Sequence, residues 1–184
     1  MKPGRLSTLV GVAVVGLALL GAGRQLQRAV SRWDQLGPLP AGGPTPRFEV
    51  LTMAGPTFDH DDLQGKVSVL TFWATWCPAC VSELGDLEEL QHEYPGADVQ
   101  FLAINHDGGL SAAEAAAKVQ GFIAERDMTL PTAIDDGTVA RRFRVGPIPH
   151  TLVLGRDGVV RHIHQGRVMS STLRDEIDGL VAAQ

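Results

Sequence analysis

The chain has 184 residues, of which 44% are hydrophobic and 20% charged, as in ordinary folded proteins, so intrinsic disorder is not expected. The formal net charge is −5, but once the five basic and one acidic residues of 1–46 are set aside, 11 basic and 20 acidic side chains remain on residues 47–184. A region this acidic would repel a phosphate backbone, which argues against a nucleic-acid partner.

An uncharged stretch follows the basic start of the chain. Residues 6–23 contain no charged side chain and no proline. As a helix they would span about 27 Å, close to the ~30 Å hydrocarbon core of a bilayer. We expect residues 1–23 to be a signal anchor, or alternatively a signal peptide that is cleaved near residues 21–23. If the amino terminus stays inside, the remainder lies outside the cytoplasm, in the periplasm or at the cell exterior, either anchored to the membrane or secreted.

Residues 24–46 are predicted to be a linker. Three arginines come first, and residues 37–46 then contain four prolines and three glycines, which disfavour both helix and strand. We therefore expect a semi-extended spacer that holds a folded domain, residues 47–184, away from the bilayer.

Strands and helices are predicted to alternate in that domain. The apolar and β-branched run Val67–Trp73 indicates a strand that is covered on both faces. Beyond it, apolar residues recur at every third position, which indicates a helix with one buried side. In chain order the predicted elements are a hairpin (48–52 and 57–58), a strand (67–73), a helix that stops at 95–96, a strand (99–104), a helix (111–126), an extended stretch (129–134), a helical turn that ends at 143, a hairpin (151–154 and 159–163) and a last helix (172–181). This order predicts an α/β sandwich with a mixed sheet.

Trp76-Cys77-Pro78-Ala79-Cys80 stands where the buried strand ends and the first helix begins. At a helix N-terminus, free N–H groups and the positive end of the dipole stabilise a thiolate, so Cys77 is the expected nucleophile. Cys80 follows one turn later on the same face, close enough to form a disulfide with Cys77 or to resolve a mixed one. Pro78 suits the first turn, where its missing N–H costs little. The pattern predicts a redox-active dithiol.

Two other uses of these cysteines are a structural disulfide and a metal site. A disulfide that closes so small a loop would contribute only about 2 kcal/mol on the chain-entropy formula. A structural zinc site needs two further ligands, and the close pair His162 and His164 has the wrong spacing for a zinc finger. The dithiol is the preferred interpretation, with no metal and no cofactor expected.

From Phe48 onward, about three quarters of its length, the chain resembles the thioredoxin superfamily. It looks most like the membrane-anchored thiol–disulfide oxidoreductases of TlpA/ResA type, which include the cytochrome c maturation proteins. The segments that carry the resemblance are 63–66, 69–80, 103–105 and 143–149. The resemblance implies a thioredoxin-like three-layer sandwich with a mixed central sheet, in addition to the N-terminal hydrophobic helix.

The resemblance also implies that Pro149 is a cis-proline that faces the dithiol, although Pro147 is a competing candidate and an ordinary trans-proline is the alternative. A proline directly before a strand is consistent with a cis peptide bond, because cis X–Pro bonds in folded proteins typically lie in tight turns. Ile148 would then offer backbone groups to an extended substrate peptide. The implied support and substrate-binding residues are Trp76, Pro78, Ala79, Ile148 and Pro149.

Glu83 matches an acidic residue that the family places beside the active site. It would accept a proton from Cys80 if burial raises its pKa; alternatively it is one more solvated carboxylate of an acidic helix. Thioredoxin itself has a buried aspartate where this chain has Thr71, which leaves Glu83 or water as the acceptor. The family more often has threonine where this chain has His150. We expect His150 to lie in a surface loop or, alternatively, to tune the Cys77 thiolate.

The expected activity is thiol–disulfide exchange with other proteins. The leading hypothesis is a protein-disulfide reductase that keeps substrate cysteines, such as those of an apocytochrome c, in thiol form and is recharged by a membrane electron-donor protein. An oxidant that introduces disulfides is the alternative, because about 30 mV of potential corresponds to only ~1.4 kcal/mol. The paired cysteines at a helix start argue against a peroxidase. A copper chaperone would need an imidazole ligand such as His150 beside the thiolates.

Overall fold

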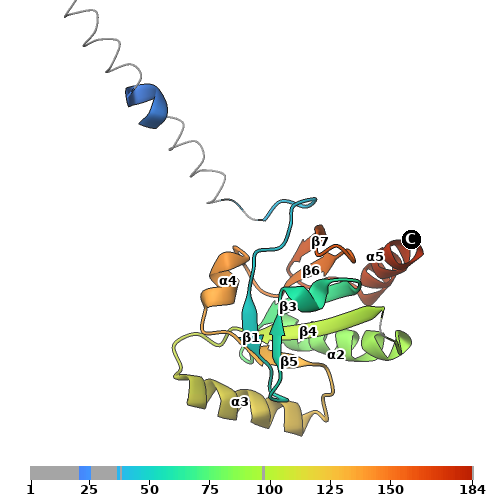
Figure 1. Cartoon of the computed structure of the whole chain (residues 1–184). Coiled ribbons are helices and arrows are strands. Elements are labelled where there is room, and N and C mark those ends of the chain that lie inside the picture. The colour runs from blue at the N-terminus through green and yellow to red at the C-terminus, as the bar shows by residue number, and fades with distance from the viewer. Residues whose placement is uncertain (1–20, 26–36, 38, 97, 184) are drawn as a thin grey trace, which may run out of the picture. The chain divides into compact units, whose positions relative to one another are not determined.

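In the computed structural model, which describes residues 21–25, 37, 39–96 and 98–183, a five-stranded sheet forms the centre of the domain. The strand order is β5-β4-β3-β6-β7 (Figure 1). β3 is parallel to β4 and β4 to β5, whereas β6 is antiparallel to β3 and β7, so the predicted mixed sheet is confirmed. The strands are β3 (Val67–Trp73), β4 (Val99–Asn105), β5 (Thr132–Ile134), β6 (His150–Leu154) and β7 (Val160–Gln165).

Helices and a small second sheet complete the domain. Its helices are α2 (Pro78–Glu93), α3 (Ala112–Glu125), α4 (Thr138–Arg142), α5 (Ser170–Ala182) and the 3₁₀ turn η1 (Asp61–Leu63), and β1 (Glu49–Leu51) pairs antiparallel with β2 (Thr57–Asp59). The extended stretch predicted at 129–134 becomes a strand only at Thr132. The reason is that the N–H groups of Thr129 and Leu130 bind the Glu88 carboxylate instead of a neighbouring strand.

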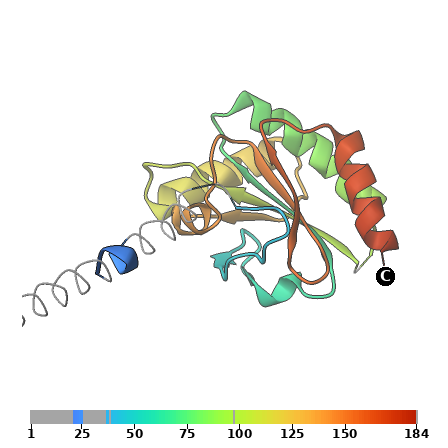
Figure 2. The same cartoon turned by 90° about the horizontal axis from the view of Figure 1, so that it is seen from above.

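β3 is buried along its whole length, as its apolar sequence predicts. Because side chains alternate along a strand, Val69 and Trp73 pack with residues of α2, α3 and α5, whereas Leu70 and Phe72 pack with the β1–β2 side, η1 and α4. Figure 2 shows α2 and α5 on one side of the sheet and η1 on the other. The arrangement is the predicted three-layer sandwich, and it places the start of α2 at the carboxyl end of β3.

Most of the predicted membrane anchor lies outside the described residues, as do residues 26–36; residues 21–25 are helical. A helix with the length and hydropathy needed to span a bilayer is absent from the part of the chain that the structure describes. Toward the end of the predicted linker, Gly42 N–H donates to Val160 O at 2.7 Å and Thr45 N–H donates to Gly158 O at 3.1 Å. Ordered contact with the domain therefore begins a few residues before the expected start near Arg47.

Candidate active site

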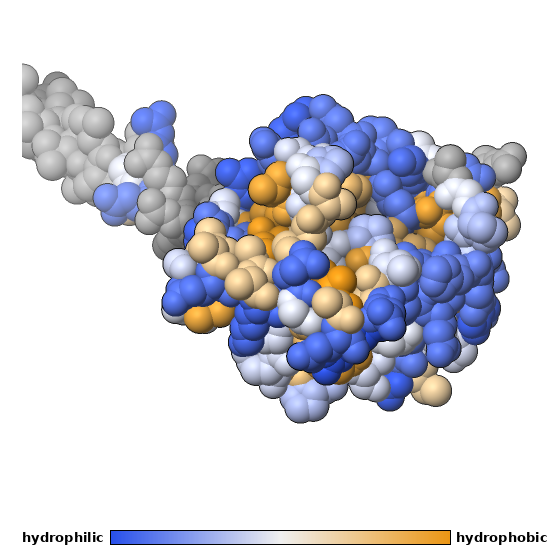
Figure 3. All heavy atoms as spheres, turned by 90° about the horizontal axis from the view of Figure 1, so that it is seen from below, coloured by the Kyte–Doolittle hydropathy of each residue, from blue (hydrophilic) through white to orange (hydrophobic). Residues whose placement is uncertain are grey.

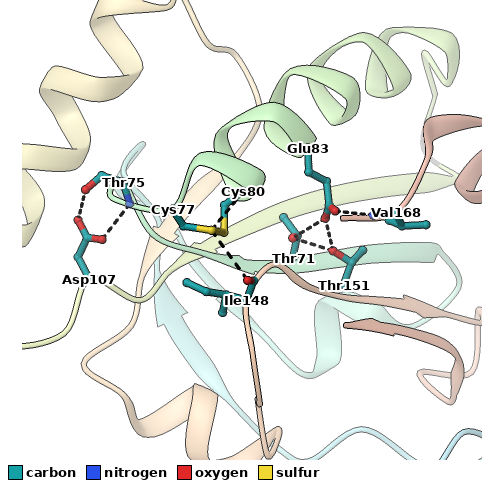
Figure 4. The surroundings of a disulfide bond; sticks show 9 residues. All are labelled: Thr71, Thr75, Cys77, Cys80, Glu83, Asp107, Ile148, Thr151 and Val168. Atoms are coloured by element: carbon teal, nitrogen blue, oxygen red, sulfur yellow. Dashed lines mark hydrogen bonds between the residues drawn. A yellow bond between two sulfur atoms is a disulfide. The ribbon is translucent and has the colours of Figure 1, made fainter. Parts of the chain in front are cut away.

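Cys77 is the N-cap residue of α2, with Pro78 at the first helical position. Its backbone is still extended, with φ −97° and ψ 103°, and its Sγ accepts a hydrogen bond from the N–H of Cys80 at 3.2 Å (Figure 4). The N–H groups of a first helical turn have no partner within the helix, and the helix dipole is positive there. The sulfur of Cys77 therefore lies where a negative charge is stabilised.

Cys77 and Cys80 form a disulfide, and their Cα atoms are 5.3 Å apart, within the usual range. Cys77 retains 7% of its exposure and Cys80 1%. Trp76, Pro78 and Ala79 are all exposed around the pair. A second protein would therefore meet Cys77 first, while Cys80 lies behind it.

The peptide bond between Ile148 and Pro149 is cis, and it is the one cis bond among the described residues, so Pro147 is not the cis-proline. The carbonyl oxygen of Ile148 lies 3.9 Å from the Cys77 sulfur (Figure 4). Ile148 is half-buried and Pro149 is buried. The backbone before the cis-proline thus borders the sulfur that an incoming substrate would meet.

Glu83 is buried, with 1% of its surface exposed, so the alternative of a solvated carboxylate is wrong. Its Oε1 accepts from the hydroxyls of Thr151 at 2.5 Å and Thr71 at 3.3 Å, and its Oε2 accepts from the N–H of Val168 at 2.9 Å. Burial raises the pKa of Glu83 above its ordinary value of 4.5, although these hydrogen bonds and the nearby His164 oppose the rise. The carboxyl is thus closer to a thiol in proton affinity than a solvated glutamate would be.

His150 does not lie in a surface loop, which corrects the expectation from the sequence. It is the first residue of β6, is fully buried, and packs edge-on against Phe72 with ring centroids 6.3 Å apart. Thr151, the next residue, points toward Glu83, so His150 points to the opposite face of the sheet, away from α2. Burial lowers its pKa, which keeps the imidazole neutral. His150 therefore neither tunes Cys77 by contact nor adds a copper ligand to the thiolates.

Asp107 is a residue of this region that the sequence analysis missed. Its carboxylate accepts from the N–H of Thr75 at 2.9 Å and from the Thr75 hydroxyl at 2.6 Å, and it pairs with Lys118 at 3.1 Å. Thr75 follows β3 and Asp107 follows β4. Neighbouring parallel strands end at the same edge of a sheet, so residues that directly follow two such strands can meet there. Their positions directly after two predicted strands were therefore the signal in the sequence that could have brought Thr75 and Asp107 together. Asp107 fixes the loop that carries Cys77.

The pair His162 and His164 has a structural partner on α5. The carboxylate of Glu176 lies between the two imidazoles, 3.2 Å from Nδ1 of His162 and 2.9 Å from Nε2 of His164. The pair thereby links β7 to α5. In the described part of the chain, no group of three or more His, Cys, Asp or Glu side chains is arranged to hold a metal ion.

Comparison with known proteins places this geometry in a family. Residues 41–163 match the AhpC/TSA family. The chain belongs to that family. It is 30% identical over 139 residues to the thiol-disulfide oxidoreductase ResA of Bacillus cereus, covering 75% of each chain. It is 31% identical over 137 residues to the thioredoxin-like protein YneN of Bacillus subtilis, covering 74% of this chain and 78% of that one.

Solved structures agree with this assignment. The exposed lipoprotein thioredoxin Etrx1 of Streptococcus pneumoniae matches with a TM-score of 0.64 at 25% identity, covering 73% of this chain and 100% of that one. The fold is therefore thioredoxin-like, and the resemblance found in the sequence is confirmed. Together with the Cys77–Cys80 disulfide, these relatives identify a thiol–disulfide oxidoreductase.

Proposed function

We propose that this oxidoreductase is a protein-disulfide reductase that works outside the cytoplasm. The observation that carries the proposal is the order of groups at the start of α2. Cys77 lies at the accessible edge, 3.9 Å from the Ile148 carbonyl, and Cys80 and Glu83 are buried behind it. This order suits a nucleophile that meets the substrate, a second thiol that releases it, and a carboxylate that receives a proton.

The proposed reaction begins with Cys77 as a thiolate and Cys80 as a thiol. The Cys77 thiolate attacks one sulfur of the substrate disulfide, so the substrate's S–S bond breaks, a mixed disulfide forms, and the other substrate sulfur leaves as a thiolate. Cys80 then loses its proton and attacks the Cys77 sulfur. The second substrate thiolate leaves, both substrate sulfurs take up protons, and two electrons have passed from the enzyme, which now holds the Cys77–Cys80 disulfide.

Glu83 is proposed to accept the proton of Cys80. It lies one helical turn after Cys80 on the same buried stripe of α2. A general base works best when its pKa approaches the working pH, and burial shifts Glu83 in that direction. The threonine hydroxyls and the Val168 N–H would then stabilise the carboxylate before the transfer and fix its orientation.

Substrate binding is proposed to use the backbone before Pro149. An extended peptide beside Ile148 would pair with its backbone groups as an added strand, with its sulfur near Cys77. Trp76, Pro78 and Ala79 would contact the same peptide from the other side, because they are exposed around the disulfide. Such contacts favour protein cysteines over small disulfides.

The proposed setting is a membrane surface. Residues 1–23 would anchor the chain with the domain of residues 47–184 in the periplasm or at the cell exterior, and residues 24–46 would join the two. Cysteines of an apocytochrome c are a suitable substrate class, since they must stay reduced until haem is attached. A membrane protein would return the enzyme to the dithiol form by delivering two electrons.

Redox titration of the Cys77–Cys80 couple against glutathione tests the direction of the reaction. A reductase needs a potential at or below that of the glutathione couple, in the range of thioredoxin near −270 mV. A potential near −120 mV, as in a strong oxidant, would instead establish disulfide formation as the function.

A further inference from the structure

A pocket of about 550 Å³ lies near the active site, and the reaction described above does not use it. It is formed by the turn between β1 and β2, the loop after β4, the first half of α3, and the end of β5 with the turn into α4. Its volume is in the range of ligand pockets, about 300–1,000 Å³. Figure 3 shows apolar residues in the middle of the lower face of the molecule, with polar residues around them.

The wall of this pocket is apolar and partly open to solvent. Leu51 and Leu110 line it with 62% and 41% of their surfaces exposed. They are two of the four large hydrophobic side chains that are exposed in the described part of the chain. On α3 the wall consists of Ala112, Ala115 and Ala116, whose short side chains leave space that longer aliphatic ones would fill. An apolar group that enters would remove apolar surface from water on both partners.

The polar groups of the pocket are mostly acidic. Among the lining residues are Asp107, Asp135 and Asp136, with His106 as the one imidazole and no lysine or arginine. Asp107 is paired with Lys118, and the buried Asp135 accepts from the N–H groups of Val139 and Ala140. Asp136 is exposed, and hydrogen bonds from Thr138, together with a smaller contribution from Arg141, hold its pKa below the ordinary value. A ligand that places a positive charge beside its apolar group would complement this rim.

Asp107 connects the pocket to the redox loop. It lines the pocket, and its carboxylate binds the N–H and the hydroxyl of Thr75, two residues before Cys77 (Figure 4). Trp76, which is 64% exposed, stands between Thr75 and Cys77. An extended peptide advances about 3.3 Å per residue, so a chain joined to Cys77 would reach the pocket within a few residues.

We propose that this pocket binds a bulky apolar side chain of the substrate polypeptide, close in sequence to the reactive cysteine and next to a basic residue. The inference rests on the protein-disulfide reductase function proposed above, and it adds a preference among substrates. A second copy of this chain fits less well, because its domain carries the same excess of acidic residues.

Peptide reduction by the full-length reduced protein tests the proposal. The probes are disulfide-containing peptides with Leu-Arg placed about two to six residues from the cysteine, and matched peptides with Ser-Arg. At one spacing we expect the Leu-Arg peptide to react about tenfold faster, in line with the burial of one leucine side chain. The rate of reduction of oxidised glutathione is the control, because it measures thiol–disulfide exchange without binding in the pocket.

Two adjacent alanines of α3 give a matched pair of variants. Ala116→Leu fills the pocket and is expected to abolish the preference for Leu-Arg. Ala117→Leu, on the exposed side of the same helix and outside the pocket lining, is expected to retain it. Leu51→Ser, at a side chain that is 62% exposed, should also weaken the preference. Glutathione reduction should stay unchanged in all three variants.

Equal rates for Leu-Arg and Ser-Arg peptides at every spacing, or a preference that survives both Ala116→Leu and Leu51→Ser, would overturn the pocket assignment while the proposed function stands. A wild-type protein that reduces glutathione but none of the peptides would overturn the proposed function, and the pocket assignment with it.

Discussion

Thr71 on β3 and Thr151 on β6 lie directly opposite each other, with their hydroxyl oxygens 2.8 Å apart and both within hydrogen-bonding distance of one carboxylate oxygen of Glu83. Thioredoxin itself has a buried aspartate on the strand at the position of Thr71. In this chain the carboxylate comes from α2, and the strand supplies a hydroxyl that holds it. The buried acid is thus retained near the dithiol although the element that provides it differs.

Glu83→Gln is expected to slow the release of substrate by Cys80, because the amide cannot accept the thiol proton. Loss of a general base typically costs about 10²–10⁴-fold in rate. Single-turnover mixing with a disulfide peptide, followed by acid quenching, would show the mixed disulfide accumulate. Glu89→Gln, an exposed glutamate on the same helix, is the matched control. Identical release rates for the two variants would remove Glu83 from the reaction.

The same carboxyl predicts a pH dependence of stability. Burial raises the pKa of Glu83 above 4.5, so the folded state binds its proton more tightly than the unfolded state does. Its contribution is therefore fully present below about pH 4.5 and is lost as pH rises through the folded-state pKa. Urea unfolding from pH 4 to 8 should show the free energy of wild type falling relative to Glu83→Gln across that window. Parallel curves would contradict the raised pKa.

Asp107→Ala is expected to destabilise the protein by about 2–3 kcal/mol. The variant leaves the Thr75 N–H and hydroxyl without their charged acceptor in a partly buried position. Asp136 lies in the loop after β5, as Asp107 lies in the loop after β4. Its carboxylate is exposed and water can replace it, so Asp136→Ala should destabilise the protein less. Urea unfolding of the two variants measures both losses of stability, provided that the slope m of the unfolding free energy against urea concentration is unchanged. Equal losses would show that Asp107 has no special role in holding the redox loop.

The roles of the two cysteines predict an asymmetric trapping experiment. Cys80→Ser removes the thiol that releases the substrate, so substrates should remain attached to Cys77 as mixed disulfides. Cys77→Ser should trap none, because Cys80 is 1% exposed. Non-reducing gels and mass spectrometry of trapped partners give the readout. Equal trapping by both variants would reverse or dissolve this assignment.

Local patterns were sufficient to predict the elements of the fold. The apolar run of β3 matches the strand Val67–Trp73 at both ends, and the Ala-rich helix predicted at 111–126 is α3 with Ser111 as its N-cap. Both depend on periodicity and capping, which are properties of neighbouring residues. The dithiol at the start of α2 was predictable for the same reason.

Residues fixed by distant partners were harder to predict. Glu83 lies three residues after Cys80 and four before Leu87, so its burial was readable from the buried stripe of α2. The burial of His150 depends on Phe72 across the sheet, and a histidine after a proline suggests a loop when no pairing is known. The role of Asp107 depends on which strands are neighbours, and no local pattern contains that information.

The pH dependence of Cys77 alkylation tests the central claim most directly. In the full-length Cys80→Ser variant, the rate of reaction with iodoacetamide reports the thiolate fraction of Cys77, and the same chain unfolded in urea is the reference. We predict a folded-state midpoint well below the ~8.5 of a free cysteine, because the sulfur lies at the N-terminus of α2. A midpoint equal to that of the unfolded chain, or a Cys77 that iodoacetamide does not reach, would contradict the account.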